Sequence, residues 1–575
     1  MNKKLLFSVV LFTSFFQVSL AQTALGYAVL DINQAFAGVN SNGSLFTNYT
    51  TYAAQFEVPA NSGKNTIYAD AMWIGGYDTA GILHMGAQTY SQTGADFFGG
   101  PVSNAAAYNT TFDTQWAQVW KINKSQIDSF VTWHANQSLW PGYTIPSVIL
   151  SWPGNGDTTQ GQSAQLAQYI DANQNGIYNP LADGDYPCIK GDQMILVIYN
   201  DDRDVHTETG GQKLKAEMHM TVYGYSRPGN WLDSAVFINY RVFNRSSEDY
   251  SNVFVAKWTD TDIGSYSDDY IGTDVTRGMF YGYNGTVNDG GSPAPGNGTY
   301  GANPPAQGVM FLRGPQADTG DGIDNDYDGS TDEPGEYCKV NRFMYYSNNP
   351  SPTGNPTNTP EYYNYMNSIW RDGSPLTYGG PGYGGTTTAH FMFPGSSDPL
   401  GFGTNFVPQA NWSEATNNNV PSDRRGLGAS GPFTFESGEA LCLDYAYLFA
   451  RGSGGPGTSV IRLQQVADST RYWYDPQQPC ACELSSPVGI SESLTPAKSI
   501  SLYPNPAGNV LFVNYEVKAA NASWSITDIT GRIVDTGLMA AGNSSAVNLS
   551  GLPAGIYTIR IIEGTTVSAA RFVKE

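Results

Sequence analysis

Alternating apolar and polar residues are the clearest pattern in this chain, and they concentrate between residues 193 and 260. Four runs there alternate as a β-strand does, with successive side chains on opposite faces. The runs are MILVIYN at 194–200, EMHMTVYGY at 217–225, AVFINYRVFN at 235–244 and NVFVAKWTD at 252–260. In the third run the apolar residues at 236, 238, 240 and 242 share one face, and Asn239 and Arg241 lie on the other. The pattern predicts an antiparallel sheet of half-buried strands.

Other periodic segments predict a hairpin, a further strand and helices. Two β-type runs at 66–76 and 82–90 flank the turn YDTAG, and EALCLDYAYLFAR at 439–451 predicts another strand. Helical spacing predicts a helix at 123–136, with a capping box from Ser125 to Asp128, and a second helix at 459–475. A short helical pattern also occupies 162–170.

The last 77 residues, Ser499–Glu575, have the pattern of a small separate β-module. Alternating runs at 510–517, 523–529 and 556–562 are separated by Pro-Asn-Pro, Thr-Gly-Arg and Pro-Ala-Gly turns. The segments LYPNPAGN, ITDITGRIV, LSGLPAGIYTIRI and the terminal RFVKE resemble the type A C-terminal sorting domain of the type IX secretion system. That resemblance implies an address recognised by the sorting machinery of the outer membrane. The cargo would then be released or held at the cell surface.

The start of the chain agrees with export. Lys3 and Lys4 precede an apolar run from Leu5 to Val18, and Ser19-Leu20-Ala21 supplies the small residues of a cleavage site. We therefore expect a signal peptide at 1–21, and no other segment is apolar enough to span a membrane. The remaining organisation predicted is an N-terminal β-rich region at 22–190, a β-sandwich-like region at 191–482 with a long insertion at 284–430, a linker at 483–498 and the sorting domain at 499–575.

Composition narrows the fold class and the partners. The chain has 64 Gly, 33 Pro and 37 Tyr with only 14% charged residues, which favours many short strands joined by turns and long loops. We expect a mainly β, multi-domain protein: an antiparallel β-sandwich-like cargo with Gly/Pro/Asn-rich loops and few short helices, and a C-terminal immunoglobulin-like β-sandwich. The formal net charge of −22 argues against nucleic acid as a partner and favours bound cations.

Cysteine chemistry suits an oxidising compartment. The five cysteines are Cys188, Cys338, Cys442, Cys480 and Cys482. Cys480 and Cys482 are too close to bridge each other without strain, so one of them is expected to pair with a distant partner such as Cys442. The odd number predicts one free thiol.

The most acidic stretch, ADTGDGIDNDYDGSTDEPGE at 317–336, predicts a calcium loop. Asp324, Asp326 and Asp328 stand at positions 1, 3 and 5, Ser330 can offer its carbonyl at position 7, and Asp332 stands at position 9. Position 12 is Gly335, so the loop is no complete EF-hand. It resembles the DGIDNDxDGxxDE calcium loops of extracellular proteins and thrombospondin type 3 repeats. The alternative is a solvated acidic linker.

Two further segments are candidate calcium sites. Asp171, Asn173 and Asn175 occupy positions 1, 3 and 5 of a similar loop, with the Ile177 carbonyl at position 7; an Asx-turn that satisfies its own backbone is the alternative. The loop after the fourth strand brings together Asp260, Asp262, Asp268 and Asp269. Such close carboxylates raise one another's pKa unless a cation separates them, although the side chains can also splay into solvent.

The strings GPGYGG at 380–385 and GLGASG at 426–431 match the letters of a dinucleotide fingerprint. Neither lies in a strand–turn–helix context, so both are expected to be loops. The motifs GxSxG and HExxH are absent.

These patterns favour an exported, calcium-binding protein of the cell surface or medium with a binding or adhesion role, its partners including glycans or surface components. The cargo also resembles poorly characterised exported proteins with the same tail. A secreted hydrolase of polysaccharide or protein and a structural part of a surface assembly remain alternatives. Two carboxyl groups facing each other across an aromatic-lined cleft would favour the enzyme, and acids confined to turns would favour binding.

The tail resemblance generates the first prediction. Deleting Leu502–Glu575 removes the address, so the folded cargo is expected to accumulate in the periplasm. Fractionation followed by immunodetection measures this, with the intact chain as control. Normal amounts of the truncated protein outside the cell would contradict the sorting role.

Overall fold

The computed structural model describes residues 25–90, 94–291, 298–327, 330–333, 335–475, 500–515, 522–528, 533–539, 544–563 and 566–575. The chain divides into two compact units, Met1–Ser485 and Ser486–Glu575. The predicted signal peptide, the linker, Cys480 and Cys482 lie outside the described residues. Among the described residues, no helix has the length and hydropathy needed to cross a membrane.

The first unit is built on two large sheets whose strand pairings are antiparallel. The nine-stranded sheet has, in spatial order, β16 (Asp269–Asp274), β17 (Met279–Asn284), β20 (Ala306–Arg313), β23 (Ala440–Ala450), β14 (Val236–Asn244), β13 (Ala216–Gly224), β12 (Gln193–Asn200) and β8 (Phe98–Gly99), with β9 (Trp120–Asn123) also paired to β12. The eight-stranded sheet has β1 (Tyr27–Leu30), β2 (Phe36–Asn40), β5 (Phe56–Glu57), β6 (Asn65–Tyr77), β15 (Tyr250–Thr261), β22 (Arg424–Phe435) and β21 (Arg342–Tyr346), with β7 (Leu83–Gly86) paired to β6.

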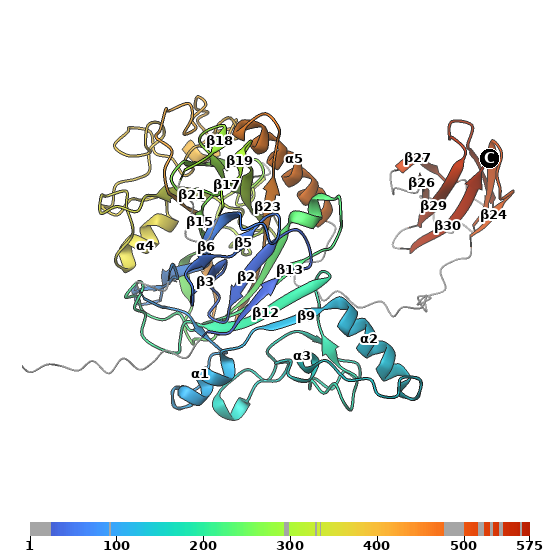
Figure 1. Ribbon diagram of the computed structural model, residues 1–575, viewed down its shortest axis with the longest axis horizontal. Coiled ribbons are helices and arrows are strands. Elements are labelled where there is room, and N and C mark those ends of the chain that lie inside the picture. Colours follow the sequence, from blue (N-terminus) through green and yellow to red (C-terminus); the bar gives the residue numbers. More distant parts are fainter. Residues whose placement is uncertain are drawn as a thin grey trace, which may run out of the picture. The chain divides into compact units, whose positions relative to one another are not determined.

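Short elements complete the first unit. The helices are α1 (Thr110–Trp116), α2 (Lys124–Ala135), α3 (Ser147–Leu150), α4 (Thr359–Met366) and α5 (Pro456–Tyr474), and Figure 1 shows where they lie around the sheets. The two-stranded ribbons pair β3 (Thr47–Asn48) with β4 (Ala53–Ala54), β10 (Tyr169–Ile170) with β11 (Tyr186–Pro187), and β18 (Asn288–Asp289) with β19 (Gly301–Ala302).

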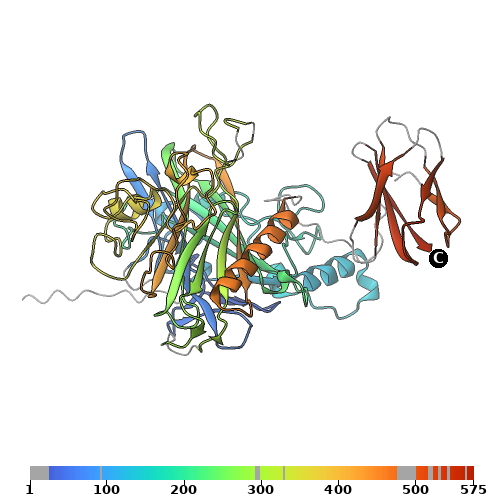
Figure 2. The ribbon, with the colours of Figure 1, turned by 90° about the horizontal axis from the view of Figure 1, so that it is seen from above.

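Two hydrophobic cores hold the layers together. The larger one contains side chains of both sheets, such as Val197 and Tyr445 from one and Trp73 and Trp258 from the other. The second core lies on the other side of the nine-stranded sheet, where α5 packs on β17, β20 and β23 (Figure 2). Helix α4 contacts β7, β15, β21 and β22, on the eight-stranded sheet. The nine-stranded sheet is therefore buried on both faces, and strands from before and after residue 190 share each sheet.

The second unit has its own core and two small antiparallel sheets. One has β24 (Ser501–Tyr503), β25 (Val510–Asn514) and β28 (Ser544–Asn548), and the other has β27 (Ile533–Leu538), β26 (Ser523–Thr527), β29 (Gly555–Glu563) and β30 (Thr566–Lys574). Buried side chains from both sheets, including Leu511, Val513, Ile526 and Ile559, form one cluster. This arrangement confirms the small β-sandwich predicted at the end of the chain.

Most predicted elements are present, with two differences in the central sheet. The hairpin is confirmed as β6 and β7, and the helices at 123–136 and 459–475 as α2 and α5. The four central runs are strands, but β15 belongs to the other sheet. In β14, Phe237 packs in the outer core whereas Ile238 packs between the sheets, so the strand is not half-buried. Helices that are distant in the sequence cover the outer face of the nine-stranded sheet with apolar side chains, and this cover explains why the strand is buried on both faces.

Three local predictions were wrong. Residues 162–170 form no helix, because their backbone bonds to the segment before them, as in Leu166 N–H to the Gly154 carbonyl at 3.0 Å. The box that caps α2 joins Asn123 and Gln126. The string at 426–431 lies inside β22. A Cβ on Gly426 would come within 3.0 Å of the Phe280 ring, so these glycines permit close packing of the sheets.

The cysteines generate the second prediction. Cys188 and Cys442 each take part in a disulfide, whereas Cys338 is a free, buried thiol whose pKa is raised to about 12 by burial. We expect no reaction of the native protein with a thiol reagent at neutral pH and one reacting thiol per unfolded, unreduced chain, because only unfolding exposes it. Peptide mapping should locate it at Cys338, and a Cys338→Ser variant should show none. Two or more thiols in the unfolded parent would contradict the expectation of two disulfides and one free thiol.

Candidate functional site

Strand register places a row of polar side chains on the eight-stranded sheet. Asp260 of β15 lies opposite Ala69 of β6 on one side and opposite Arg425 of β22 on the other. Arg425 in turn lies opposite Tyr346 of β21. Because β15 and β22 are antiparallel, the end of the first strand meets the start of the second. This geometry brings Asp423, just before β22, beside Asp260 and Asp262.

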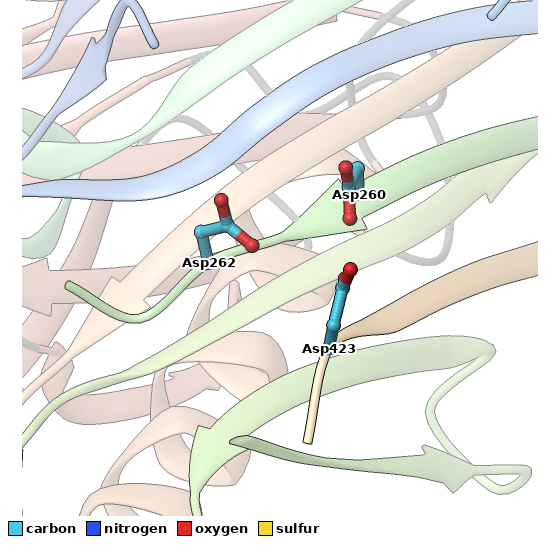
Figure 3. A group of neighbouring side chains, drawn as sticks. All are labelled: Asp260, Asp262 and Asp423. Carbon is cyan, nitrogen blue, oxygen red and sulfur yellow. The ribbon is translucent and has the colours of Figure 1, made fainter. Parts of the chain in front are cut away.

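The three carboxyl groups form a compact cluster. Their oxygens lie within 4.8 Å of one another, and Figure 3 shows Asp260, Asp262 and Asp423 pointing toward a common space. Asp260 is 3% exposed and Asp262 is 5% exposed. In each of the three residues, the Oδ1 atom is buried and has no hydrogen-bond partner among the described residues. Buried carboxylate oxygens without donors are costly, so the cluster is suited to a proton or a cation.

One guanidinium balances part of the negative charge. Arg425 donates from Nη2 to Asp423 Oδ2 at 2.9 Å and lies 3.9 Å from Asp260 Oδ2. Its Nε donates to the Tyr90 hydroxyl at 2.6 Å, and that hydroxyl donates to Asp260. Asp262 takes no part in this network. The three acids therefore share one close cation.

Burial changes the protonation of these acids. It raises the pKa of Asp260 to about 7, partly offset by Arg425, and the charge of Asp423 raises it further. Burial also raises the pKa of Asp262 well above its usual value, with Asp260 and Asp423 adding to the effect. When all three groups are ionised at neutral pH, the cluster therefore carries negative charge that its neighbours do not balance.

The acid cluster lies in the wall of a cavity of about 670 Å³. Five tyrosines also line it: Tyr68, Tyr90, Tyr266, Tyr346 and Tyr362. Polar groups come from Asn348, Asn355 and Thr357, and from Glu208, which accepts from the Tyr362 hydroxyl at 2.8 Å. A cavity of this size with aromatic walls and a few convergent polar groups has the features of a small-ligand site.

A stacked aromatic layer supports the tyrosine walls. The rings of Trp73 and Trp258, from neighbouring strands, stack with centroids 6.4 Å apart. Tyr362 of α4 packs against Trp73 at 4.9 Å, and Tyr90 packs against Trp258 at 5.1 Å. Both tyrosines are therefore fixed by packing as well as by hydrogen bonds.

The other acids predicted after β15 do not belong to the group of three. Asp269 is buried and accepts from the Ile263 N–H at 2.8 Å, and burial raises its pKa. Asp268 does not join the carboxyl group of three. Sequence spacing indicated Asp260 and Asp262 but not Asp423, Arg425 or Tyr90. Only strand register brings those three residues to the site.

The acidic loop at 317–336 brings together Asp324 and Asp326 with Glu336, whose oxygens lie within 4.8 Å of one another. Glu336 was not predicted as a ligand. Its carboxylate accepts a hydrogen bond from the Asn325 N–H, which holds it in the loop. Asp328 lies outside the described residues, and Ser330 is exposed. Asp332 accepts from the Gly322 N–H at 3.2 Å.

The third candidate loop uses its side chains on its own backbone. Asp171 accepts from the Gly176 N–H at 2.7 Å, and Asn173 accepts from the Asn175 N–H at 3.1 Å. The Asn175 side chain accepts from the Ile177 N–H at 2.7 Å. These bonds have the form of the Asx-turn alternative.

Comparison with protein families identifies the tail. A model of the secretion system C-terminal sorting domain matches residues 501–575. The match confirms the resemblance found in the sequence and indicates export to the cell surface or secretion, with the sorting machinery as a partner. Comparison with curated proteins gave no match.

Two solved structures show weak likeness. PorZ, a bacterial surface component of the type-IX secretion system of Porphyromonas gingivalis, matches over 13% of this chain and 11% of its own, with 19% identity and a TM-score of 0.12. A polysaccharide lyase matches over 62% of this chain and 34% of its own, with 9% identity and a TM-score of 0.17. At these scores neither likeness assigns a fold or an activity to the cargo.

The buried acids generate the third prediction. In the presence of a chelator at pH 8, Asp262→Asn is expected to raise the melting temperature by a few degrees, because burial raises the pKa of the Asp262 carboxyl and so lowers stability at high pH, whereas the amide does not titrate. A carboxyl whose pKa is higher in the folded than in the unfolded state adds stability that is fully present below pH ~4. This stability is lost as pH rises toward the folded pKa, by about 1.4 kcal/mol per pH unit. The gain should therefore be smaller at pH 5.

Thermal unfolding followed by circular dichroism measures this, with Asp204→Asn as the control because Asp204 is an exposed carboxylate. A lower melting temperature for Asp262→Asn at pH 8 would contradict the charge strain.

Proposed function

We propose that this exported chain is a calcium-dependent glycan-binding protein of the cell surface or the surrounding medium. The observation that carries the proposal is the group of three carboxyls, two buried and one half-buried, each with an unpartnered oxygen, in the wall of a tyrosine-lined cavity. The family match supplies the destination.

Calcium suits the donor set. It takes six to eight oxygen ligands in a flexible arrangement, and carboxylates are its usual protein ligands. Asp260, Asp262 and Asp423 would fill part of that set and leave positions open toward the cavity. Hydroxyl groups of a ligand can complete the shell there, so the cation would bind the ligand as well as neutralise the acids.

Glycans suit the cavity walls. Tyrosine rings offer apolar faces with a polar edge, which fits a sugar ring that has apolar C–H faces and hydroxyl edges. The amides of Asn348 and Asn355 offer donors and acceptors to those hydroxyls. The cavity volume of about 670 Å³ holds a few sugar rings at most, which favours recognition of a short glycan segment.

A secreted hydrolase is the second candidate, favoured by the protonation of the site. Asp260, with a pKa raised to about 7, would serve as a proton donor near neutral pH. Asp423, held by Arg425, would act as the ionised partner. This pair lies in an aromatic-lined cavity rather than only in turns, which supports the hydrolase as a candidate.

The acidic loop adds a separate proposed calcium site. Asp324, Asp326 and Glu336 would hold a cation that stabilises the loop, at a place distinct from the cavity wall. Its removal is expected to lower stability and to leave glycan binding intact.

The fourth prediction tests the binding role. The full mature chain is applied to immobilised polysaccharides with calcium and then with a chelator, and binding is expected only with calcium. Asp423→Asn should weaken calcium-dependent binding at least tenfold, or about 1.4 kcal/mol, because it removes a ligand. Tyr266→Ala should weaken it because it removes a cavity wall. Tyr383→Ala is the matched control, since Tyr383 is exposed to 38% against 39% for Tyr266 and does not line the cavity.

The double variant Asp324→Asn/Asp326→Asn should bind normally. New reducing ends released from the polysaccharide would favour the hydrolase, and binding that is equal with calcium and chelator would contradict the calcium-dependent proposal.

A further inference from the structure

A lysine and an aspartate meet inside the sandwich, away from the cavity. Asp70 of β6 lies opposite Thr259 of β15, and Lys257 is two residues before Thr259 on the same face. Such diagonal neighbours on paired strands are within reach of a long side chain. The Lys257 Nζ atom lies 2.5 Å from Asp70 Oδ1, and both side chains are 0% exposed.

Aromatic residues of the opposite sheet enclose the pair. Lys257 Nζ donates to the Tyr240 hydroxyl at 2.9 Å and lies 5.8 Å from the centre of the Tyr445 ring. The Tyr447 hydroxyl donates to Asp70 Oδ2 at 2.6 Å. No water-exposed surface reaches either charged group, so the pair is held in a medium of low polarity.

Burial favours the uncharged forms of both groups. It raises the pKa of the Asp70 carboxyl and lowers the pKa of the Lys257 amine, although each partner opposes the change. A neutral amine is a nucleophile, and a protonated carboxyl can lose its hydroxyl as water. Burial therefore favours the two reactive forms in contact with each other.

We propose that Lys257 and Asp70 condense to an intramolecular isopeptide bond that joins β6 to β15. The geometry supplies what the reaction needs: an amine beside the carboxyl group that it attacks, donors on the oxygen that becomes negative, and exclusion of water that would reverse the reaction.

The atoms balance without any further reagent. The Lys257 Nζ lone pair attacks Asp70 Cγ and forms the C–N bond. Thr259 Oγ1 and the Tyr447 hydroxyl, each 2.6 Å from Asp70 Oδ2, stabilise the negative charge that develops there. A proton from Nζ passes to Oδ1, which carries the acid proton, the Cγ–Oδ1 bond breaks, and one water molecule leaves. Oδ2 becomes the amide oxygen.

The bond would close a loop from residue 70 to residue 257. It would fix two neighbouring strands near the middle of the eight-stranded sheet. A covalent link of this kind restricts the unfolded chain, as a disulfide does, but reducing agents do not break it. Such a link suits a protein that works outside the cell.

The test is mass spectrometry of the full mature chain after reduction and unfolding. The proposal expects a mass about 18 Da below that of the sequence, the mass of one water. Protease digestion should give a branched peptide that contains both Asp70 and Lys257. A full-mass chain with the two residues on separate peptides would overturn the proposal and leave a buried ion pair.

The chain provides an internal control. Lys121 Nζ lies 2.6 Å from Asp31 Oδ1, almost the same separation, but these side chains are 30% and 49% exposed. Their peptides should stay separate, and a branch there would show that the chemistry is unspecific and would overturn the argument from burial.

Variants test the roles of the neighbours. Lys257→Met should give the full mass calculated for the variant. Tyr447→Phe keeps the ring but removes a donor to Oδ2, so a larger fraction of uncondensed chains is expected shortly after synthesis. Complete condensation at the parent rate in Tyr447→Phe would overturn the role assigned to this hydroxyl, while the mass of the parent still decides the bond itself.

Discussion

The pairing of β15 with β6 and β22 is the constraint on which the rest of the first unit depends. Strand β15 has buried polar side chains on both of its faces. Lys257 points between the sheets, and Asp260 lies in the wall of the cavity. Because side chains alternate along a strand, a slip of one residue in register would exchange these two faces. The Lys257 amine would lose Asp70, and the acids would enter the core. The register of β15 therefore determines the interior contact and the candidate site together.

Buried polar groups of this kind reduce stability unless something compensates them. Inside the sandwich, Lys257 forms an ion pair with Asp70 Oδ1, and two hydroxyl groups donate to Asp70 Oδ2. In the cavity wall, three carboxyls face one close arginine, and Asp262 has no donor. The interior cluster is paired within the chain, whereas Asp262 in the cavity cluster has neither an ion pair nor a hydrogen-bond donor among the described residues. That contrast distinguishes a structural contact from a candidate binding site.

The sequence allowed prediction of the local elements better than their arrangement. Period-two alternation identified β12, β13, β14 and β15, and helical spacing identified α2 and α5, because these signals are local. The transfer of β15 to the second sheet was not predictable, since strand pairing is set by distant segments. Asp260 and Asp262 were found as a local acid pair, but Asp423 is more than 160 residues away and reaches them only through register. The glycines of β22 were misjudged because their role, close approach of aromatic rings across the sandwich, leaves no periodic signal.

The tail shows the opposite case, in which local sequence is sufficient. Its turns and strands follow one another along the chain, so an ordered set of short motifs identified the module that the family model also matches. Its described core residues all belong to 507–572, and no described residue beyond Tyr474 contributes to the two cores of the cargo. Each unit therefore has a hydrophobic core of its own, and the motifs of the tail can be recognised from local sequence without knowledge of how the cargo folds.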